Sequence, residues 1–172
     1  VARRVKNPVL DNLIANCREG CELSLLNEKG AVRGLMKLLK NGESVGLLVD
    51  QNTKTHQGGI FVNFFDLPVT ISKSPATLAR RLKADVLLSV CRRTKTGFRV
   101  ELKDMPQQAE KYEDDQQFSQ AVMDLMRTYV EETPEQWVWY YNRWNYIPKG
   151  RQDLKDKFPY YATMDKHLEF EG

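Results

Sequence analysis

Residues 31–50 read AVRGLMKLLKNGESVGLLVD, and this stretch gives the first indication of the fold. Its first half repeats apolar residues at helical spacing, at Val32, Leu35, Met36, Leu38 and Leu39. This pattern predicts a helix over residues 31–40, ended by Asn41-Gly42. The following run, VGLLVD at residues 45–50, is short, apolar and closed by an aspartate, which predicts a buried strand.

The rest of the chain continues this alternation of helix and strand. The expected elements are a loop over residues 51–59, a strand over 60–65, a helix from Ser74 with Pro75 in its first turn, a buried strand over 86–92, a turn over 94–97, its hairpin partner over 98–102, and a helix over 114–132 that Pro134 ends. Such alternation predicts an α/β fold, with a mixed sheet flanked by helices.

Composition is ordinary for a folded protein. The chain has 172 residues, 41% of them hydrophobic and 28% charged, which suits one domain with a sizeable core. The net charge of +3 would suit anionic partners such as phosphorylated lipids or an acidic carrier protein, although a chance excess of lysine and arginine explains it equally well. No run approaches the roughly 20 apolar residues that span a bilayer. The first residues lack both an initiator methionine and a signal-peptide core, so we expect the sequence to start within a longer protein.

The three cysteines, Cys17, Cys21 and Cys91, are odd in number and unevenly spaced. They argue against a disulfide framework and for a reducing compartment. With no histidine nearby to complete a zinc site, they are expected to be buried free thiols, and no metal or cofactor is expected.

The strongest local signal for a site is Asp50-Gln51, followed by Gly58-Gly59. Ligand sites in open α/β sheets lie beyond the carboxyl ends of strands, where the loops leave a crevice. A carboxylate and an amide there would orient a substrate hydroxyl or hold a basic side chain. The alternative, that Asp50 only caps a turn, is equally open at this point.

Two further clusters have competing interpretations. The aromatic block over residues 137–146 contains Trp137, Trp139, Tyr140, Tyr141, Trp144 and Tyr146, with Arg143 among them. It fits a nucleic-acid stacking surface or a membrane-interface belt, but core packing with Arg143 stacked or paired is favoured. The basic cluster comprises Arg80, Arg81, Lys83, Arg92, Arg93 and Lys95, and a solvated surface is its default interpretation.

Five blocks, taken in order, resemble the lipid A biosynthesis lauroyl/myristoyl acyltransferase family, within the glycerolipid acyltransferase superfamily. The blocks are VARRVKNP at residues 1–8, GLLVDQ at 46–51, GIFVNFF at 59–65, Thr70 with SPATLA at 74–79, and PEQWVW at 134–139 with Arg143-Trp144. Asp66 departs from the family, which usually has glycine there. The resemblance implies an acyltransferase-like domain, incomplete at its N-terminus, over residues 1–147, with residues 148–172 as a C-terminal extension.

By this resemblance the reaction transfers a fatty acyl chain from an acyl carrier protein or acyl-CoA thioester to a hydroxyl of a lipid A precursor. The family's base is a histidine in a His-x-x-x-x-Asp/Glu pair, in which the carboxylate orients the imidazole. Neither histidine here fits, because Phe61 lies five residues after His56 and Gly172 lies five after His167. The chain is therefore expected to lack the catalytic pair and to be inactive alone.

The resemblance also implies substrate-side residues and a location. Arg3, Asp50 and Gln51 match family positions and are expected to bind substrate, with no catalytic residue in this chain. The implied setting is the cytoplasmic face of the bacterial inner membrane, peripheral or anchored through preceding residues, with no nucleic-acid partner. Rival hypotheses are an acyltransferase for another acceptor, such as a phosphatidylinositol mannoside or glycerol phosphate, and a non-catalytic module that binds lipid or protein.

Overall fold

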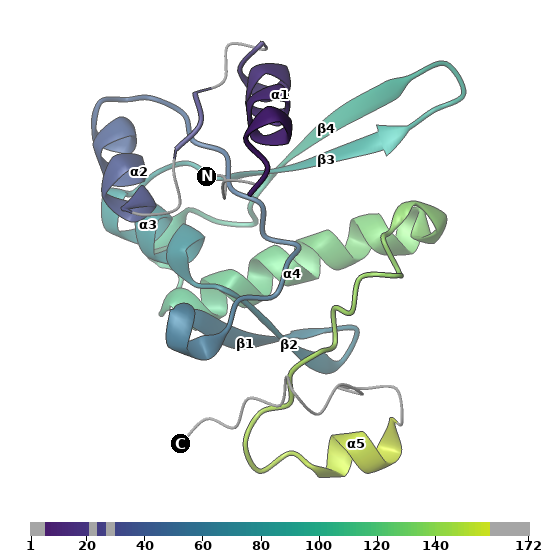
Figure 1. The fold of residues 1–172 in the computed structure, drawn as a ribbon. Helices are drawn as coiled ribbons and strands as arrows, with labels where there is room; N and C mark the ends of the chain where they lie inside the picture. The colour runs from purple at the N-terminus through teal and green to yellow at the C-terminus, as the bar shows by residue number, and fades with distance from the viewer. Residues whose placement is uncertain (1–5, 21–23, 27–29, 159–172) are drawn as a thin grey trace. The chain divides into compact units, whose positions relative to one another are not determined.

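The computed structural model describes residues 6–20, 24–26 and 30–158. The chain divides into two compact units, residues 1–47 and residues 48–172, which are described separately. Within the described ranges there are five α-helices and two antiparallel sheets of two strands each (Figure 1).

The first unit contains helices α1 (Pro8–Glu19) and α2 (Ala31–Lys40). The side-chain oxygen of Asn7 caps α1, accepting hydrogen bonds from the N–H groups of Val9 at 3.0 Å and Leu10 at 3.3 Å, and Pro8 occupies the first turn. The Asn7-Pro8 pair therefore starts a helix that the sequence analysis did not anticipate. Helix α2 has the predicted bounds, and Leu35 is its buried residue.

The buried strand predicted over residues 45–50 is wrong, because these residues form neither strand nor helix. A strand persists only where a neighbour satisfies its backbone N–H and C=O groups. No described strand pairs with this run, and Leu48 is 85% exposed.

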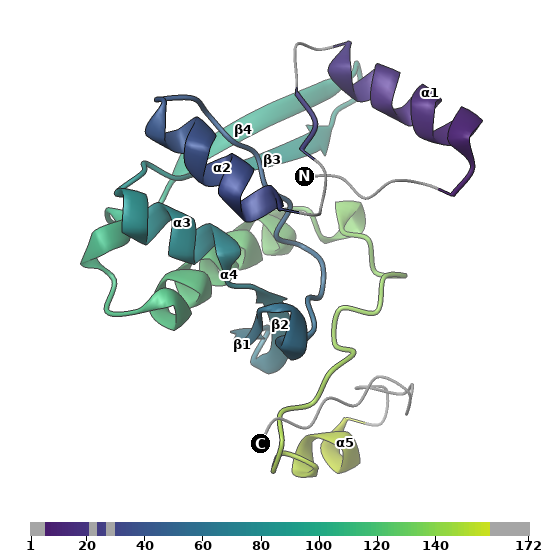
Figure 2. The same ribbon diagram turned by 60° about the vertical axis from the view of Figure 1, so that its left-hand side comes forward.

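The second unit is organised around the 18-residue helix α4 (Asp115–Glu132). The Asp114 carboxylate caps this helix by accepting the Gln117 N–H at 2.7 Å, and Gln117 Oε1 accepts the Glu113 N–H at 2.8 Å. Helix α3 (Ser74–Leu82) packs beside α4 (Figure 2), and the short helix α5 (Asp153–Lys157) follows later in the chain. Both α3 and α4 agree with the sequence analysis.

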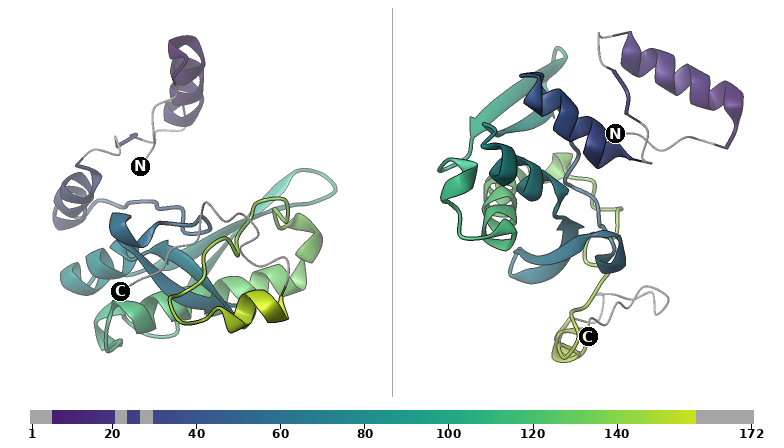
Figure 3. Two further views of the ribbon diagram at one scale, coloured as in Figure 1. Left: turned by 60° about the horizontal axis from the view of Figure 1, so that its bottom comes forward. Right: turned by 90° about the vertical axis from the view of Figure 1, so that its left-hand side faces the viewer.

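Two hairpins contact α4 (Figure 3). Strand β1 (Gly59–Phe64) pairs with β2 (Leu67–Ser72), and β3 (Leu87–Arg93) pairs with β4 (Phe98–Asp104). The predicted pairing of residues 86–92 with 98–102 is confirmed, but only Leu88 in β3 is buried, so the expectation of a fully buried strand there is wrong. The expected mixed sheet is replaced, within the described residues, by these two separate antiparallel sheets.

The β1–β2 turn explains the departure at Asp66. Phe65 and Asp66 have φ angles of 51° and 63°, which make a two-residue turn with left-handed backbone at both positions. Glycine adopts this backbone most readily, and aspartate tolerates it better than most side chains. Asp66 therefore keeps the turn that a glycine would make.

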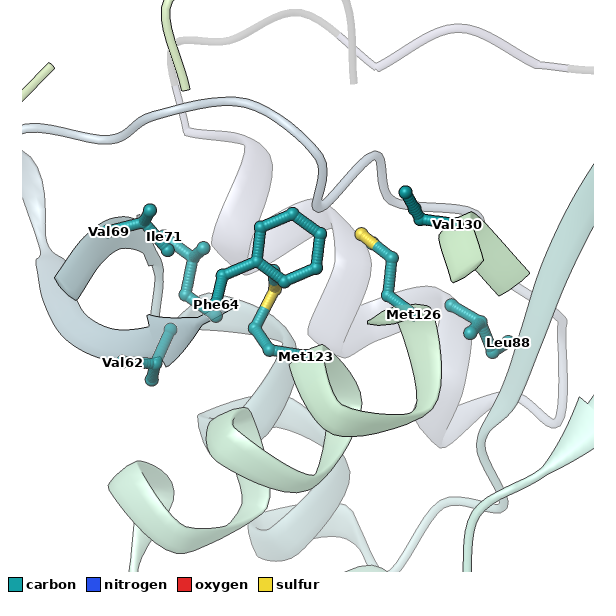
Figure 4. Packing of buried hydrophobic residues seen from close by; sticks show 8 residues of the cluster. All are labelled: Val62, Phe64, Val69, Ile71, Leu88, Met123, Met126 and Val130. Atoms are coloured by element: carbon teal, nitrogen blue, oxygen red, sulfur yellow. The ribbon is translucent and has the colours of Figure 1, made fainter. Parts of the chain in front are cut away.

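The largest core cluster joins both hairpins to one face of α4 (Figure 4). Its buried members are Val62, Phe64, Val69, Ile71, Leu88, Met123, Met126 and Val130. A second cluster packs α3 against the start of α4, through Ala76, Ala79, Ala109, Tyr112, Phe118 and Val122. Helix α4 is thus the common support of the second unit.

Candidate functional site

Asp50 and Gln51 are both exposed and stand at the start of the loop that leads into β1. The loop contains a short 3-10 turn, η1 (Thr55–Gln57), and then Gly58-Gly59. Their side chains are therefore free to reach a ligand, provided that the loop holds a fixed conformation.

Asn52 fixes the loop, by three hydrogen bonds to a segment about ninety residues away in the chain. Its backbone N–H donates to Tyr141 Oη at 2.8 Å, and its Nδ2 donates to the Asn142 carbonyl at 2.9 Å. Its Oδ1 accepts a hydrogen bond from Arg143 Nη1. Because Asn52 directly follows Gln51, these bonds also restrain the backbone of the candidate pair.

Among the described residues, Arg143 has the largest fully buried side chain, at 0% exposure. Its Nη1 also donates to the Thr70 carbonyl of β2 at 2.8 Å, and its Nη2 lies 4.0 Å from Met123 Sδ of α4. Burial lowers the pKa of Arg143 to about 10, while interactions with Tyr141 and Asp50 work to raise this pKa. The expectation that Arg143 is packed and paired in the core is confirmed, and Asp50 supplies nearby negative charge.

Gly59 holds the other end of the loop. A Cβ at this residue would lie 2.0 Å from the carbonyl oxygen of Thr53, so only glycine fits. Gly58, with φ of 86°, makes the left-handed turn that ends η1. The two glycines therefore fold the loop back on itself, between Asn52 and β1.

The aromatic block divides into a packed part and an exposed part. Trp137 and Trp144 lie against Phe64, with ring centroids 5.6 and 5.9 Å apart, and Trp144 Nε1 donates to the Phe64 carbonyl at 3.1 Å. Trp139 stacks on Trp144 at 6.4 Å yet remains exposed, and Tyr140 is 97% exposed. Core packing is thus confirmed for Trp137 and Trp144 and is wrong for Trp139 and Tyr140.

The basic cluster is partly neutralised within the fold. Arg80 pairs with Asp115 at 2.7 Å and also donates to the carbonyls of Tyr112 and Glu113. Arg92 pairs with Glu132 at 2.5 Å and with Glu101 at 3.6 Å. The exposed members are Arg81, Lys83, Arg93 and Lys95.

Asp115, the first residue of α4, is hydrogen-bonded to two residues of α3. Its Oδ2 accepts a hydrogen bond from the Thr77 hydroxyl at 2.5 Å, in addition to the pair with Arg80. Burial works to raise the pKa of Asp115, but the hydrogen bonds from Thr77 and Arg80 and the positive charge of Arg80 outweigh it and hold the pKa below its ordinary value.

The other residues singled out in the sequence analysis are either outside the described residues or exposed. Arg3, Cys21 and His167 lie outside the described residues. His56 is exposed in η1, and Cys17 and Cys91 are free but exposed, so the expectation that they are buried is wrong. Among the described residues, no cluster of three or more histidine, cysteine, aspartate or glutamate side chains is placed to hold a metal ion. No helix in that part of the chain combines the length and the hydropathy needed to cross a bilayer.

Comparison with protein families places these features in context. Residues 1–146 match the family model described as bacterial lipid A biosynthesis acyltransferase, and a search of curated proteins gave no match. The matched range includes Asp50-Gln51, the Asn52 anchor and Arg143. Because it spans most of the 172 residues, the chain belongs to the bacterial lipid A biosynthesis acyltransferase family.

Proposed function

We propose that this chain provides the substrate-side part of an enzyme that transfers a fatty acyl chain to a hydroxyl of a lipid A precursor. The donor is an acyl carrier protein or coenzyme A thioester. The observation that carries the proposal is the exposed Asp50-Gln51 pair, held by the Asn52–Arg143 anchor within the range that matches the family.

In this reaction the acceptor hydroxyl attacks the thioester carbonyl, the C–S bond breaks, and the thiol leaves as a new ester forms. A base must take the hydroxyl proton. His56 and His167 are not followed at the fifth position by a carboxylate, so neither supplies the histidine pair that the family uses. The proposal is therefore that this chain alone binds substrate without turnover.

Asp50 and Gln51 offer complementary groups to a sugar-based acceptor. The carboxylate accepts hydrogen bonds from hydroxyl or amide groups, and the Gln51 amide both donates and accepts. Arg3 is proposed to hold a phosphate, as a charged and bidentate donor. The negative charge of Asp50 favours the charged form of the buried Arg143 guanidinium.

The proposed setting is the cytoplasmic face of the bacterial inner membrane. There the exposed basic residues Arg81, Lys83 and Lys95 would attract an acidic carrier protein or anionic headgroups. This attraction would weaken as salt is added, because exposed charges are screened over about 10 Å at 0.1 M ionic strength.

Two measurements test the proposal on the full chain. In the first, incubation with an acyl thioester and a diphosphorylated glucosamine lipid is expected to give no acyl transfer. Turnover that disappears on His56→Ala would contradict the assignment of substrate binding without catalysis.

In the second, binding of the same lipid in detergent micelles is followed by fluorescence. Asp50→Ala and Gln51→Ala are each expected to weaken binding by about tenfold, the effect of losing one or two hydrogen bonds. Asp85→Ala, at another exposed aspartate, is the matched control and is expected to leave binding unchanged. Equal affinities for all four proteins would refute the role of Asp50-Gln51.

A further inference from the structure

The β3–β4 hairpin carries its apolar residues on the side that faces away from α4. Its outer face is formed by alternate residues of the two strands, which the register places side by side: Leu87, Ser89, Cys91 and Arg93 of β3, and Asp104, Leu102, Val100 and Phe98 of β4. All eight are exposed. The largest apolar side chains among them, Leu87, Phe98, Val100 and Leu102, are 52%, 71%, 63% and 63% exposed.

On the inner face of the same hairpin, β4 contributes charged residues where apolar ones are expected. Leu88 and Val90 of β3 reach the core, but Glu101 of β4 points to the same side as Arg92 and pairs with it. An antiparallel hairpin packed on one side ordinarily turns apolar residues inward and polar residues outward. Contiguous exposed apolar residues are typical of interaction surfaces, and the inverted alternation of β4 therefore makes the outer face a candidate for one.

The charges on the outer face are self-complementary. Arg93 lies at one end of the hairpin, with its guanidinium over the Phe98 ring at 5.6 Å, and Asp104 lies at the other end, opposite Leu87. Six residues of β3 separate the two ends, which corresponds to about 20 Å of strand. Arg93 and Asp104 therefore cannot pair within one copy.

We propose that the outer face of β3–β4 docks against the same face of a second copy of this chain, related by a two-fold axis that runs across the strands. This rotation places the cross-strand pair Arg93–Phe98 of each copy over the pair Leu87–Asp104 of the other. At each end of the interface, Arg93 of one copy then attracts Asp104 of the other. The two middle cross-strand pairs, Ser89–Leu102 and Cys91–Val100, then meet near the axis. With only eight residues a side, the dimer belongs to the weak and concentration-dependent class.

A charge exchange gives the sharpest test, and it does not depend on acyltransferase activity. The self-association constant of the full chain is measured by sedimentation over a concentration series. Arg93→Glu and Asp104→Lys are each expected to weaken association by about tenfold, and the double variant to restore it. Because the two residues are too far apart to interact within one copy, restoration requires contact between copies.

Two further variants separate the outer face from general effects on the hairpin. Val100→Lys places a charge at the centre of the interface and is expected to abolish association. Thr96→Lys adds the same charge in the exposed hairpin turn and is expected to leave association unchanged. Far-ultraviolet circular dichroism confirms that each variant is folded.

Chemical crosslinking locates the contact. In a Cys17→Ser/Cys21→Ser background, a short bis-maleimide is expected to link Cys91 of the two copies, since packed sheets lie about 10 Å apart. A chain that stays monomeric at all concentrations, a dimer that persists in Val100→Lys, or an outer face that binds lipid vesicles in place of a second copy would each overturn the proposal.

Discussion

Arg143 and Asn52, 91 residues apart in the chain, are joined by a hydrogen bond from the buried guanidinium to the amide oxygen. This bond ties the loop that carries Asp50-Gln51 to the segment after α4. It also links a fully buried charge of the second unit to the loop of the candidate pair.

Arg143→Met is expected to lower the free energy of unfolding by about 2–4 kcal/mol, because it leaves the Thr70 carbonyl and the Asn52 amide oxygen without their donor. Asn52→Ala is expected to cost about 2 kcal/mol by the same reasoning. In urea titrations the double variant should lose less than the sum of the two single losses, since the residues share one network. Additive losses would mean that Arg143 and Asn52 act independently.

Gly59→Ala is expected to destabilise the second unit by about 3 kcal/mol, because its Cβ would meet the Thr53 carbonyl oxygen at 2.0 Å. Gly58→Ala has no atom within 4 Å of the added methyl and meets only the left-handed backbone, so about 1 kcal/mol is expected. Thermal unfolding followed by circular dichroism compares the two neighbours. A larger loss at Gly58 than at Gly59 would contradict the close approach of the loop.

Thr70→Val is expected to raise stability by about 1 kcal/mol, although Thr70 belongs to one of the blocks that resemble the family. The residue is fully buried, and its hydroxyl has no hydrogen-bond partner in the part of the chain that the structure describes. Valine has the same shape without the unpaired polar group, and the backbone carbonyl that accepts from Arg143 is retained. Loss of stability in denaturant titrations would show that the hydroxyl is bonded.

Asp115 predicts a pH dependence of stability. Its pKa in the folded chain is held below the ordinary value of 3.8, so its ionised form stabilises the fold fully above that value. The contribution is lost as the pH falls from 3.8 through the folded pKa. The stability difference between the wild type and Asp115→Asn should therefore be constant near neutrality and shrink as the pH falls below 3.8. A difference that does not change over this range would contradict the role of Thr77 and Arg80.

Local patterns in the sequence were sufficient for much of the fold. Apolar spacing located α2, α3 and α4, and alternation located the β3–β4 hairpin. Residues 45–50 show the limit of such reasoning, since an apolar run becomes a strand only where another strand satisfies its backbone. Strand β2 was missed because Pro68 weakens its strand pattern, a residue that an edge position tolerates.

The candidate site was only partly accessible to sequence analysis. Asp50 and Gln51 were identified, and pairing of Arg143 was expected, but the partner Asn52 was not. The pairing is a long-range relationship, and the only local signal was a second amide directly after Gln51. Likewise, four of the six residues of the basic cluster are exposed, while carboxylates on α4 pair with Arg80 and Arg92.

The two hairpins form separate sheets within the described residues, and both rest on α4 and on the segment that follows it, where Gln136 bonds to the β3 backbone and Trp137 packs on Phe64 of β1. Opening of β3–β4 need not disturb the β1–β2 ladder, whereas loss of α4 exposes both. The second unit should therefore open in stages under native conditions. The β3–β4 hairpin should exchange its amide protons before strand β1, which follows the Asp50-Gln51 loop. The loop that carries Asp50-Gln51 would then keep its conformation while the β3–β4 hairpin opens and closes.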